Sequence, residues 1–379
     1  MLKIVCDNKI PFLKGVLEPY AEVVYLPGAK IAKADLADAD GLIVRTRTKC
    51  NKALLEGTKV KFVATATIGF DHIDADYCAS KGIFWTNASG CNSASVAQYI
   101  ASAILNVAVE NKFSLSDKTI GIIGVGNVGS KVAKFAKTAG MKVLLNDPPR
   151  ARKEGGASFV SLERILSESD IITMHVPLSM AGSDKTYHLA DKIFFNSIAK
   201  SAWFINSSRG EVTDTAELKN ILKTSRIAGA ILDVWENEPE IDLELLGLAK
   251  FATPHIAGYS TDGKANGTSM SVDALAKFFG IKQLEGWYPK DVPKPENTTI
   301  KIDCKGKSKE QILLEAVKFT YDIKGDDQRL RSSPRTFEKL REEYPLRREF
   351  KIFKIIPGGI PDEAMKILHD LGFETTVDR

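Results

Sequence analysis

The stretch Thr119-Ile-Gly-Ile-Ile-Gly-Val-Gly-Asn-Val-Gly129 decides the fold. An apolar run that predicts a buried strand leads into glycines spaced as GxGxxG, and a helical pattern leads out of them. In such a unit the first glycine permits a tight turn, the second lets the backbone approach a pyrophosphate, and the third lets helix pack on strand. The stretch therefore predicts a dinucleotide-binding Rossmann unit. Its predicted cofactor contacts are Gly124, Gly126, Asn127, Val128 and Gly129.

Asp147 follows the next predicted strand, residues 142–146. A carboxylate there accepts hydrogen bonds from both ribose hydroxyls and repels a 2′-phosphate, so Asp147 predicts NAD and not NADP. Arg150 and Arg152 lie just beyond it and could reverse this preference, because guanidinium groups bind phosphate. A glycine turn in some other α/β unit is the alternative interpretation.

The same α/β pattern continues on both sides of the glycine loop, because short apolar runs alternate with amphipathic segments and turn signals. A Pro-rich connection at 285–297 then leads into a basic but ordered tail. Strands are expected at 2–6, 22–26, 41–45, 61–66, 83–86, 119–124, 142–146, 170–175, 202–206, 227–233, 299–303 and 351–356. Helices are expected from 92 or 93 to about 111, and at 128–138, 162–167, 216–223, 269–279, 309–321, 336–343 and 362–371.

The composition excludes several classes of protein. The chain of 379 residues carries 52 basic and 48 acidic side chains, which gives no reason to expect a nucleic-acid partner. No run approaches the roughly 18 apolar residues of a membrane-spanning helix. The five cysteines are scattered without a CxxC pair. We therefore expect a cytoplasmic protein with no membrane segment, no disulfide framework and no metal site.

Three later loops carry candidate catalytic residues. Arg209 follows the strand at 202–206, Glu238 follows the strand at 227–233, and His255 lies in a Pro/Gly-bounded loop. An arginine holds a carboxylate as a planar fork, a histidine takes a hydroxyl proton, and a glutamate orients the imidazole and stabilises its protonated form. Each residue alone also has a structural explanation. Together, after a dinucleotide motif, they suit oxidation of a 2-hydroxy acid.

Four runs carry a family resemblance: the GxGxxG loop, Asn206-Ser-Ser-Arg-Gly210, Leu232-Asp-Val-Trp-Glu-Asn-Glu-Pro239 and Pro254-His-Ile-Ala-Gly258. Through them the chain resembles the D-isomer-specific 2-hydroxyacid dehydrogenases. Further runs resemble the members that oxidise 4-phospho-D-erythronate on the bacterial route to pyridoxal 5′-phosphate. These runs include Val44-Arg-Thr-Arg-Thr-Lys49, Ser89-Gly-Cys-Asn92 and Asn146-Asp-Pro-Pro-Arg150.

The resemblance implies an architecture. A Rossmann NAD-binding domain, residues 94–259, would be inserted in a flavodoxin-like substrate domain formed by residues 1–93 and 260–285. Residues 286–379 would form a C-terminal α+β dimerisation domain, so a homodimer is expected. The active site would lie in the cleft between the first two domains, with hinge motion closing it.

The resemblance also implies roles for single residues. Arg209, Glu238 and His255 would be catalytic, with His255 as general base while hydride passes to NAD. Thr46, Thr67 and Tyr259 would contact the substrate. Beyond the glycine loop and Asp147, the cofactor contacts would come from Val176, Ser207, Ser208, Arg209, Asp233 and Gly258.

A phosphorylated substrate needs a cationic site. Arg45 and Arg47 follow a predicted strand, and alternation directs both to the same face, so we expect Arg45 to bind the phosphate. An ordinary surface face of paired charges is the alternative. Arg47, Lys49 and the pair Arg347-Arg348 in the tail are further candidates.

Two other functions remain open from the sequence. The substrate could be another phosphorylated 2-hydroxy acid such as 3-phosphoglycerate. The chain could also be a non-catalytic NAD-sensing protein, against which the complete set of arginine, glutamate and histidine counts.

Overall fold

The computed structural model describes residues 1–375. The chain forms two compact units: Met1–Asn92 with Ser260–Pro293, and Ser93–Tyr259 with the tail that starts at Lys294. Parallel sheets form the centre of both units, which confirms the predicted α/β class. The division into three domains stays a prediction, because the tail packs in the same compact unit as residues 93–259.

The first unit is built on a five-stranded parallel sheet. Its strands are β1 Lys3–Asp7, β2 Glu22–Leu26, β3 Gly41–Val44, β4 Phe62–Thr65 and β5 Phe84–Asn87. They are ordered β2-β1-β3-β4-β5, which is the flavodoxin-like order. Every residue of β3 and β4 is buried, as continuous apolar strands of a parallel sheet require. The helices of this unit are α1 Lys52–Leu55, α2 Ala75–Ser80 and α10 Thr261–Phe279.

Helix α10 begins at Thr261, whereas the sequence predicted a start at Ser269. The hydroxyl of Ser260 caps it by accepting the N–H of Gly263 at 2.8 Å. Glycines in the first turns lower helix propensity and hid this start. A Cβ on Gly267 would lie 2.6 Å from the carbonyl oxygen of Ala66, so a glycine is needed where the helix passes the end of β4.

A six-stranded parallel sheet forms the centre of the second unit. Its strands are β6 Thr119–Ile123, β7 Lys142–Asn146, β8 Ile171–Met174, β9 Trp203–Asn206, β10 Gly229–Leu232 and β11 Phe251–Ala252. They are ordered β11-β10-β9-β8-β6-β7. The chain passes from β6 to β7 on one side and returns to β8 on the other. Such a switch point, beside β6, is where open α/β sheets bind ligands.

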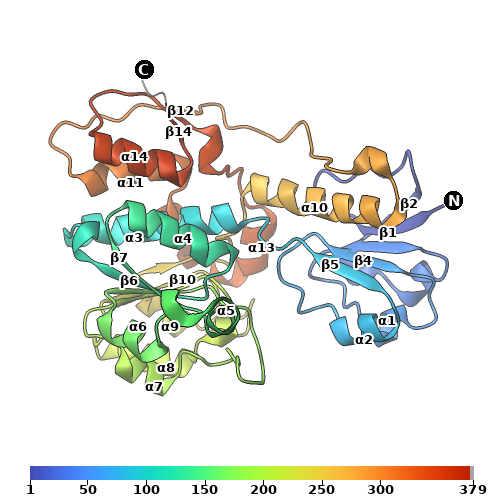
Figure 1. Cartoon of the computed structure of the whole chain (residues 1–379), viewed down its shortest axis with the longest axis horizontal. Coiled ribbons are helices and arrows are strands. Elements are labelled where there is room, and N and C mark those ends of the chain that lie inside the picture. Colours follow the sequence, from blue (N-terminus) through green and yellow to red (C-terminus); the bar gives the residue numbers. More distant parts are fainter. Residues whose placement is uncertain (376–379) are drawn as a thin grey trace. The chain divides into compact units, whose positions relative to one another are not determined.

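Helices cover both faces of this sheet (Figure 1). On one face α3 Ser93–Asn111 and α4 Asn127–Thr138 share a buried apolar core with the strands. On the other face a second core is formed with four shorter helices, α6 Leu162–Glu168, α7 Lys192–Ser197, α8 Thr215–Lys223 and α9 Leu243–Leu248. Helix α5, Pro148–Glu154, follows β7.

The tail forms a layer on α3 and α4. Its helices are α11 Lys309–Thr320, α12 Ile323–Ser332, α13 Phe337–Glu342 and α14 Asp362–Leu371, and its short parallel strands are β12 Thr299–Ile300, β13 Lys354–Ile355 and β14 Glu374–Thr375. Helix α11 packs on α3, and α14 packs on α4. Helix α12 was not predicted, because its polar sequence places only Ile323, Asp326 and Leu330 in the interior.

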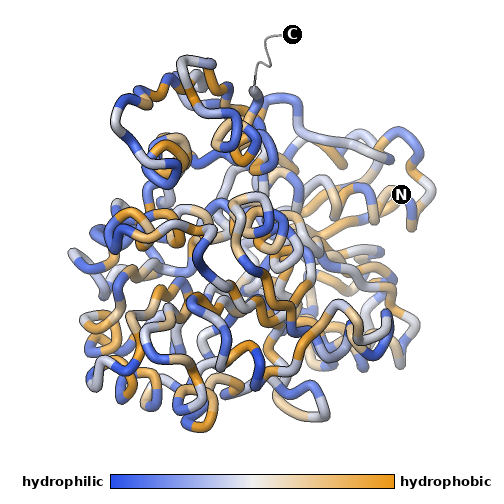
Figure 2. Tube along the Cα trace, turned by 60° about the vertical axis from the view of Figure 1, so that its left-hand side comes forward, coloured by the Kyte–Doolittle hydropathy of each residue, from blue (hydrophilic) through white to orange (hydrophobic). Residues whose placement is uncertain are grey.

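Along the helices, hydrophobic and hydrophilic residues alternate as amphipathic packing requires (Figure 2). Among residues 1–375, no helix is both long enough and apolar enough to cross a membrane.

The same substitution at two helical glycines should change stability in opposite directions. Gly267→Ala should destabilise the protein by roughly 1–3 kcal/mol, because the new Cβ meets the backbone of Ala66. Gly325→Ala in α12 should stabilise it by roughly 0.5–1 kcal/mol, because the space around Gly325 is open. Urea unfolding of both variants measures this. Equal effects would contradict the close approach of α10 to β4.

Candidate active site

Glu238 and His255 form a hydrogen-bonded pair in the second unit. His255 Nδ1 lies 2.8 Å from Glu238 Oε2, and Glu238 Oε1 accepts the N–H of Trp235 at 3.0 Å. The carboxylate therefore fixes the imidazole tautomer, and Nε2 is the ring nitrogen that can accept a substrate proton. His255 and Asn237 both have left-handed backbone conformations, at φ 56° and 61°, a strain common at functional sites.

The charge state of Glu238 follows from its neighbours. Burial by itself would raise its pKa, but the charge of His255, the hydrogen bonds from His255 and Trp235, and the charge of Arg341 together hold the pKa of Glu238 below its ordinary value. Glu238 is therefore ionised at neutral pH. An ionised carboxylate at Nδ1 is the partner that a general-base histidine requires.

Asp233 anchors the loop that carries His255. Its carboxylate is 1% exposed and accepts hydrogen bonds from the Thr253 hydroxyl at 2.6 Å, the Ile256 N–H at 2.8 Å and the Ala257 N–H at 2.9 Å. Burial raises the pKa of Asp233, while His255 and these three donors act in the opposite direction. The side chain predicted to contact NAD thus also fixes the loop that carries His255.

Gly210 allows the loop of Arg209 to lie against the loop that leads to Glu238. Arg209 follows β9, and a Cβ on Gly210 would lie 2.0 Å from the carbonyl group of Trp235. Only a glycine permits this approach, which places the loop after β9 against the loop that leads to Glu238. The backbone therefore brings together the loops of Arg209, Glu238 and His255, whose shared role stays a prediction.

The glycine loop has the geometry that a dinucleotide requires. Gly124 has φ +85°, and a Cβ there would lie 2.6 Å from the carbonyl oxygen of His175. A Cβ on Gly129 would lie 2.1 Å from the carbonyl oxygen of Gly124, so α4 packs directly on the loop. At Gly126 a Cβ would meet nothing within 4 Å, which leaves open space beside the N-terminus of α4. A pyrophosphate fits there, on the amides of the helix N-terminus.

The neighbours of Asp147 favour NAD. Its carboxylate accepts the N–H of Val125 at 2.8 Å and caps α5 through the N–H of Arg150 at 3.1 Å. Arg150 is engaged by Glu154 at 2.8 and 2.7 Å, and Arg152 pairs with Asp184. Both arginines that could have attracted a 2′-phosphate therefore already have acidic partners.

The other predicted cofactor residues occupy the same edge of the sheet. Val176 follows β8 and lies against Gly124, and Gly258 follows the His255 loop. Ser208 Oγ donates to Asn206 at 2.8 Å. Ser207 Oγ is buried and has no hydrogen-bond partner within residues 1–375. Such a hydroxyl is able to form a hydrogen bond with a bound cofactor. These residues fit NAD, although their individual contacts stay predictions.

The predicted phosphate and substrate residues Arg45, Thr46 and Thr67 lie in the first unit, whereas Tyr259 belongs to the second. Arg45 donates to the carbonyl of Lys9 at 3.3 Å, Thr46 is exposed, and the hydroxyl of Thr67 lies 2.7 Å from that of Thr65.

Lys264 in α10 was not predicted as a site residue. Burial and the charge of Arg45 both lower the pKa of Lys264, so two cations lie close together in the first unit. Its position in a helix whose start was misplaced explains why the sequence analysis missed it.

Arg347, considered as a phosphate ligand, is only 4% exposed. Its guanidinium donates to Gln98 Oε1 at 2.9 Å and to the carbonyls of Ser95 at 2.7 Å and Ile256 at 3.3 Å, and it stacks on Tyr321. These donors connect the tail to α3 and to the loop that carries His255, so Arg347 has a structural role.

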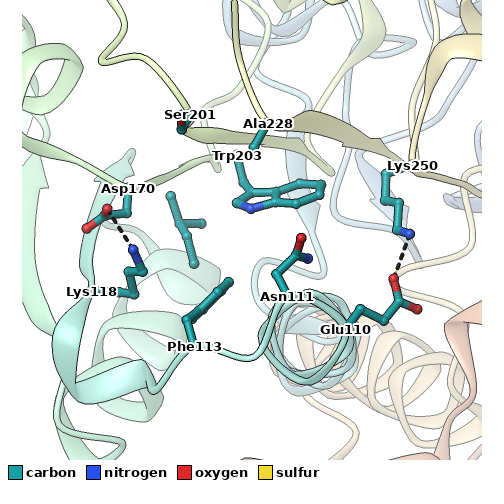
Figure 3. Close-up of a pocket in the computed structure, with 10 residues that line it drawn as sticks. Glu110, Asn111, Phe113, Lys118, Asp170, Ser201, Trp203, Ala228 and Lys250 are labelled. Carbon is teal, nitrogen blue, oxygen red and sulfur yellow. Dashed lines mark hydrogen bonds and ion pairs between the residues drawn. The ribbon is translucent and has the colours of Figure 1, made fainter. Parts of the chain in front are cut away.

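None of these residues lines the cavity of about 650 Å³ in the second unit. Figure 3 shows the residues that do line it. Trp203 and Phe113 line it, together with the ion pairs Lys118–Asp170 at 3.2 Å and Lys250–Glu110 at 2.6 Å. It opens at the amino ends of the strands, whereas the glycine loop and the His255 loop follow the carboxyl ends. The cavity is therefore not the catalytic site.

Comparison with known proteins identifies the class. Residues 98–257 match the family model "D-isomer specific 2-hydroxyacid dehydrogenase, NAD binding domain", and residues 292–372 match a domain of unknown function. The chain is similar to D-lactate dehydrogenase of Aquifex aeolicus in complex with NAD and lactic acid (26% identity, TM-score 0.60, 76% of this chain and 98% of that one). It is also similar to NAD⁺-bound 3-phosphoglycerate dehydrogenase of Entamoeba histolytica (26% identity, TM-score 0.62, 75% and 97%). Fold and site define an NAD-dependent 2-hydroxyacid dehydrogenase.

Relatives that match nearly the whole chain identify the family more closely. The chain is 52% identical over 356 residues to erythronate-4-phosphate dehydrogenase of Bacteroides thetaiotaomicron, covering 94% of this chain and 99% of the relative. It is 42% identical over 375 residues to the enzyme of the same name from Porphyromonas gingivalis, covering 98% and 100%. The chain belongs to the erythronate-4-phosphate dehydrogenase family.

Two glycines of the loop should separate cofactor binding from folding. Gly126→Ala should leave the fold intact and weaken NADH binding, because its Cβ enters the open space where the pyrophosphate fits. Gly129→Ala should instead lower stability, because its Cβ meets the backbone of Gly124. NADH fluorescence titration and urea unfolding measure the two effects. Undiminished affinity in Gly126→Ala would rule out this position for the pyrophosphate.

The pair of His255 and Glu238 should determine how kcat/KM for oxidation depends on pH. His255→Ala should lower kcat by roughly 10²–10⁴, as loss of a general base does. Glu238→Gln should move the acidic limb of kcat/KM for oxidation to lower pH, because a neutral amide no longer stabilises the protonated imidazole. His188, 2.7 Å from Glu236, is the matched control, and His188→Ala should leave the profile unchanged. An unchanged limb in Glu238→Gln would contradict the pairing.

Proposed function

We propose that this chain oxidises 4-phospho-D-erythronate at C2 to (R)-3-hydroxy-2-oxo-4-phosphobutanoate, with NAD as hydride acceptor, in pyridoxal 5′-phosphate biosynthesis. The observation that carries the proposal is the 2.8 Å contact between Glu238 and His255, on two loops that lie next to the loop of Arg209. The chain is also 52% identical to an erythronate-4-phosphate dehydrogenase.

The three catalytic residues have different tasks. NAD would be held by the glycine loop and Asp147 and would supply the hydride acceptor for C2. His255 Nε2 accepts the hydroxyl proton of the substrate, so that C2 becomes a carbonyl carbon. Glu238 keeps the imidazole oriented and stabilises its positive charge. Arg209 holds the C1 carboxylate and polarises the C2 oxygen through its guanidinium.

Turnover with different acids tests the substrate. Formation of NADH, followed by its fluorescence, should be fastest with 4-phospho-D-erythronate and much slower with 3-phosphoglycerate. Faster turnover of 3-phosphoglycerate would make the chain a dehydrogenase of that acid. Binding of NADH without turnover of either acid would favour an NAD-sensing protein.

Arg45 is the proposed ligand of the substrate phosphate, with Lys264 beside it as a second cation. A charge-assisted contact of this kind contributes roughly 1.5–3 kcal/mol. Arg45→Ala should therefore raise KM for the phosphorylated acid by one to two orders of magnitude. Arg45→Lys should recover part of the loss, because an ammonium keeps the charge and loses the fork.

Two controls make this prediction specific. D-Erythronate lacks the phosphate, so Arg45→Ala should scarcely change its kinetics. Arg209→Ala should impair both acids alike, because both carry the C1 carboxylate. Equal weakening of both acids by Arg45→Ala would make Arg45 a structural residue.

We further propose that the protein is a cytoplasmic homodimer that associates through the tail. The exposed apolar side chains of Phe319 and Leu346, 45% and 46% exposed, support an interface there. Light scattering of Phe319→Glu and Leu346→Glu should show weakened dimers. A monomeric parent chain, or dimers unaffected in both variants, would reject this interface.

A further inference from the structure

Resting on the proposed function, we propose that Arg341 in the tail helix α13 is a positioning residue of the hydride-transfer site. Its guanidinium holds the ring of Tyr259 and supplies a fixed positive charge to the pair of Glu238 and His255. A residue of the tail thereby contributes to the hydride-transfer site of the same chain.

The tail holds α13 firmly in this position. Phe337, the first residue of α13, is 1% exposed and belongs to the same apolar core as α8 and α9. Just beyond the helix, the ring of Tyr344 packs edge-on against Tyr259, with centroids 5.9 Å apart. The Tyr344 hydroxyl donates to Asp326 of α12 at 2.7 Å. Anchors on both sides therefore fix the direction in which Arg341 points.

The contacts of Arg341 lead to the site. Its guanidinium carbon lies 5.5 Å from the centroid of the Tyr259 ring and 5.8 Å from that of Phe337, within the range of cation–π attraction. Its Nη1 donates to Glu338 at 2.9 Å. Its Nε is buried and has no hydrogen-bond partner within residues 1–375. An arginine left partly unsatisfied beside a predicted substrate contact indicates a function beyond packing.

The charges around Arg341 also point to the catalytic pair. Burial lowers the pKa of Arg341, but Tyr259, Glu238, Glu338 and Asp233 raise it above its ordinary value, so the group stays charged. Glu238 is faced by His255 from the loop after β11 and by Arg341 from α13. A fixed cation next to this pair favours the carboxylate and opposes uptake of a further proton.

Removing the charge of Arg341 should shift the pH dependence of kcat/KM in a predictable direction. In Arg341→Gln the pair of Glu238 and His255 should take up a proton more readily. The acidic limb of kcat/KM should therefore move to higher pH, by roughly half a unit or more. This is opposite to the shift expected for Glu238→Gln. The value of kcat should also fall by roughly tenfold, because the Tyr259 ring loses its contact with the guanidinium.

Two variants serve as comparisons. Arg341→Lys keeps the charge and loses the planar face, so it should restore the pH limb and only part of kcat. Lys339→Gln removes a positive charge from the exposed side of the same helix and should change neither quantity. Thermal unfolding of all three variants separates these effects from loss of the fold.

A second readout does not depend on turnover. NMR of the imidazole protons of the full-length protein, with His255→Ala for assignment, should show the protonation midpoint of the pair moved upward in Arg341→Gln. If the parent chain oxidises neither acid, the proposed function fails, while this titration still tests Arg341. An unmoved midpoint in a folded Arg341→Gln variant would overturn the proposal. A raised KM with an unmoved midpoint would also overturn it and make Arg341 a direct substrate ligand.

Discussion

The hydrogen bonds of the buried Asp233 carboxylate are the interaction on which the position of the His255 loop depends. A charge removed from water is costly unless it is fully hydrogen bonded, and here a hydroxyl and two backbone amides supply the bonds. The donors lie on both sides of His255 in sequence. Asp233 directly follows β10. The sheet therefore sets the position of His255. The orientation by Glu238 would be ineffective if the loop could move.

Local sequence rules predicted much of the fold, because buried parallel strands are short apolar runs. The strand Glu22–Leu26 and the helix Asp362–Leu371 were placed correctly. The polar helix α12 and the short helices α5, α7 and α9 were missed, because polar or very short segments carry little apolar periodicity.

The candidate site divides in the same way. The glycine loop was visible in the sequence, because each glycine permits a backbone conformation or a close approach that a side chain would prevent. Arg209 and Glu238 were visible because each follows a predicted strand, and His255 because it lies in a Pro/Gly-bounded loop. Arg341 was not, because a cation in a short helix far along the chain has no local signature. Only the packing of the tail reveals its proximity to Tyr259.

Helix α3 has a consequence for dynamics. It lies between the sheet and the tail, and nearly every residue from Ser93 to Ala108 is buried, including the polar Gln98 and Ser102. Backbone amides in the buried part of this helix are protected from local opening, so they open only when the whole unit opens. In hydrogen exchange, α3 should therefore form the slowest core and report the global stability of the unit, tail included.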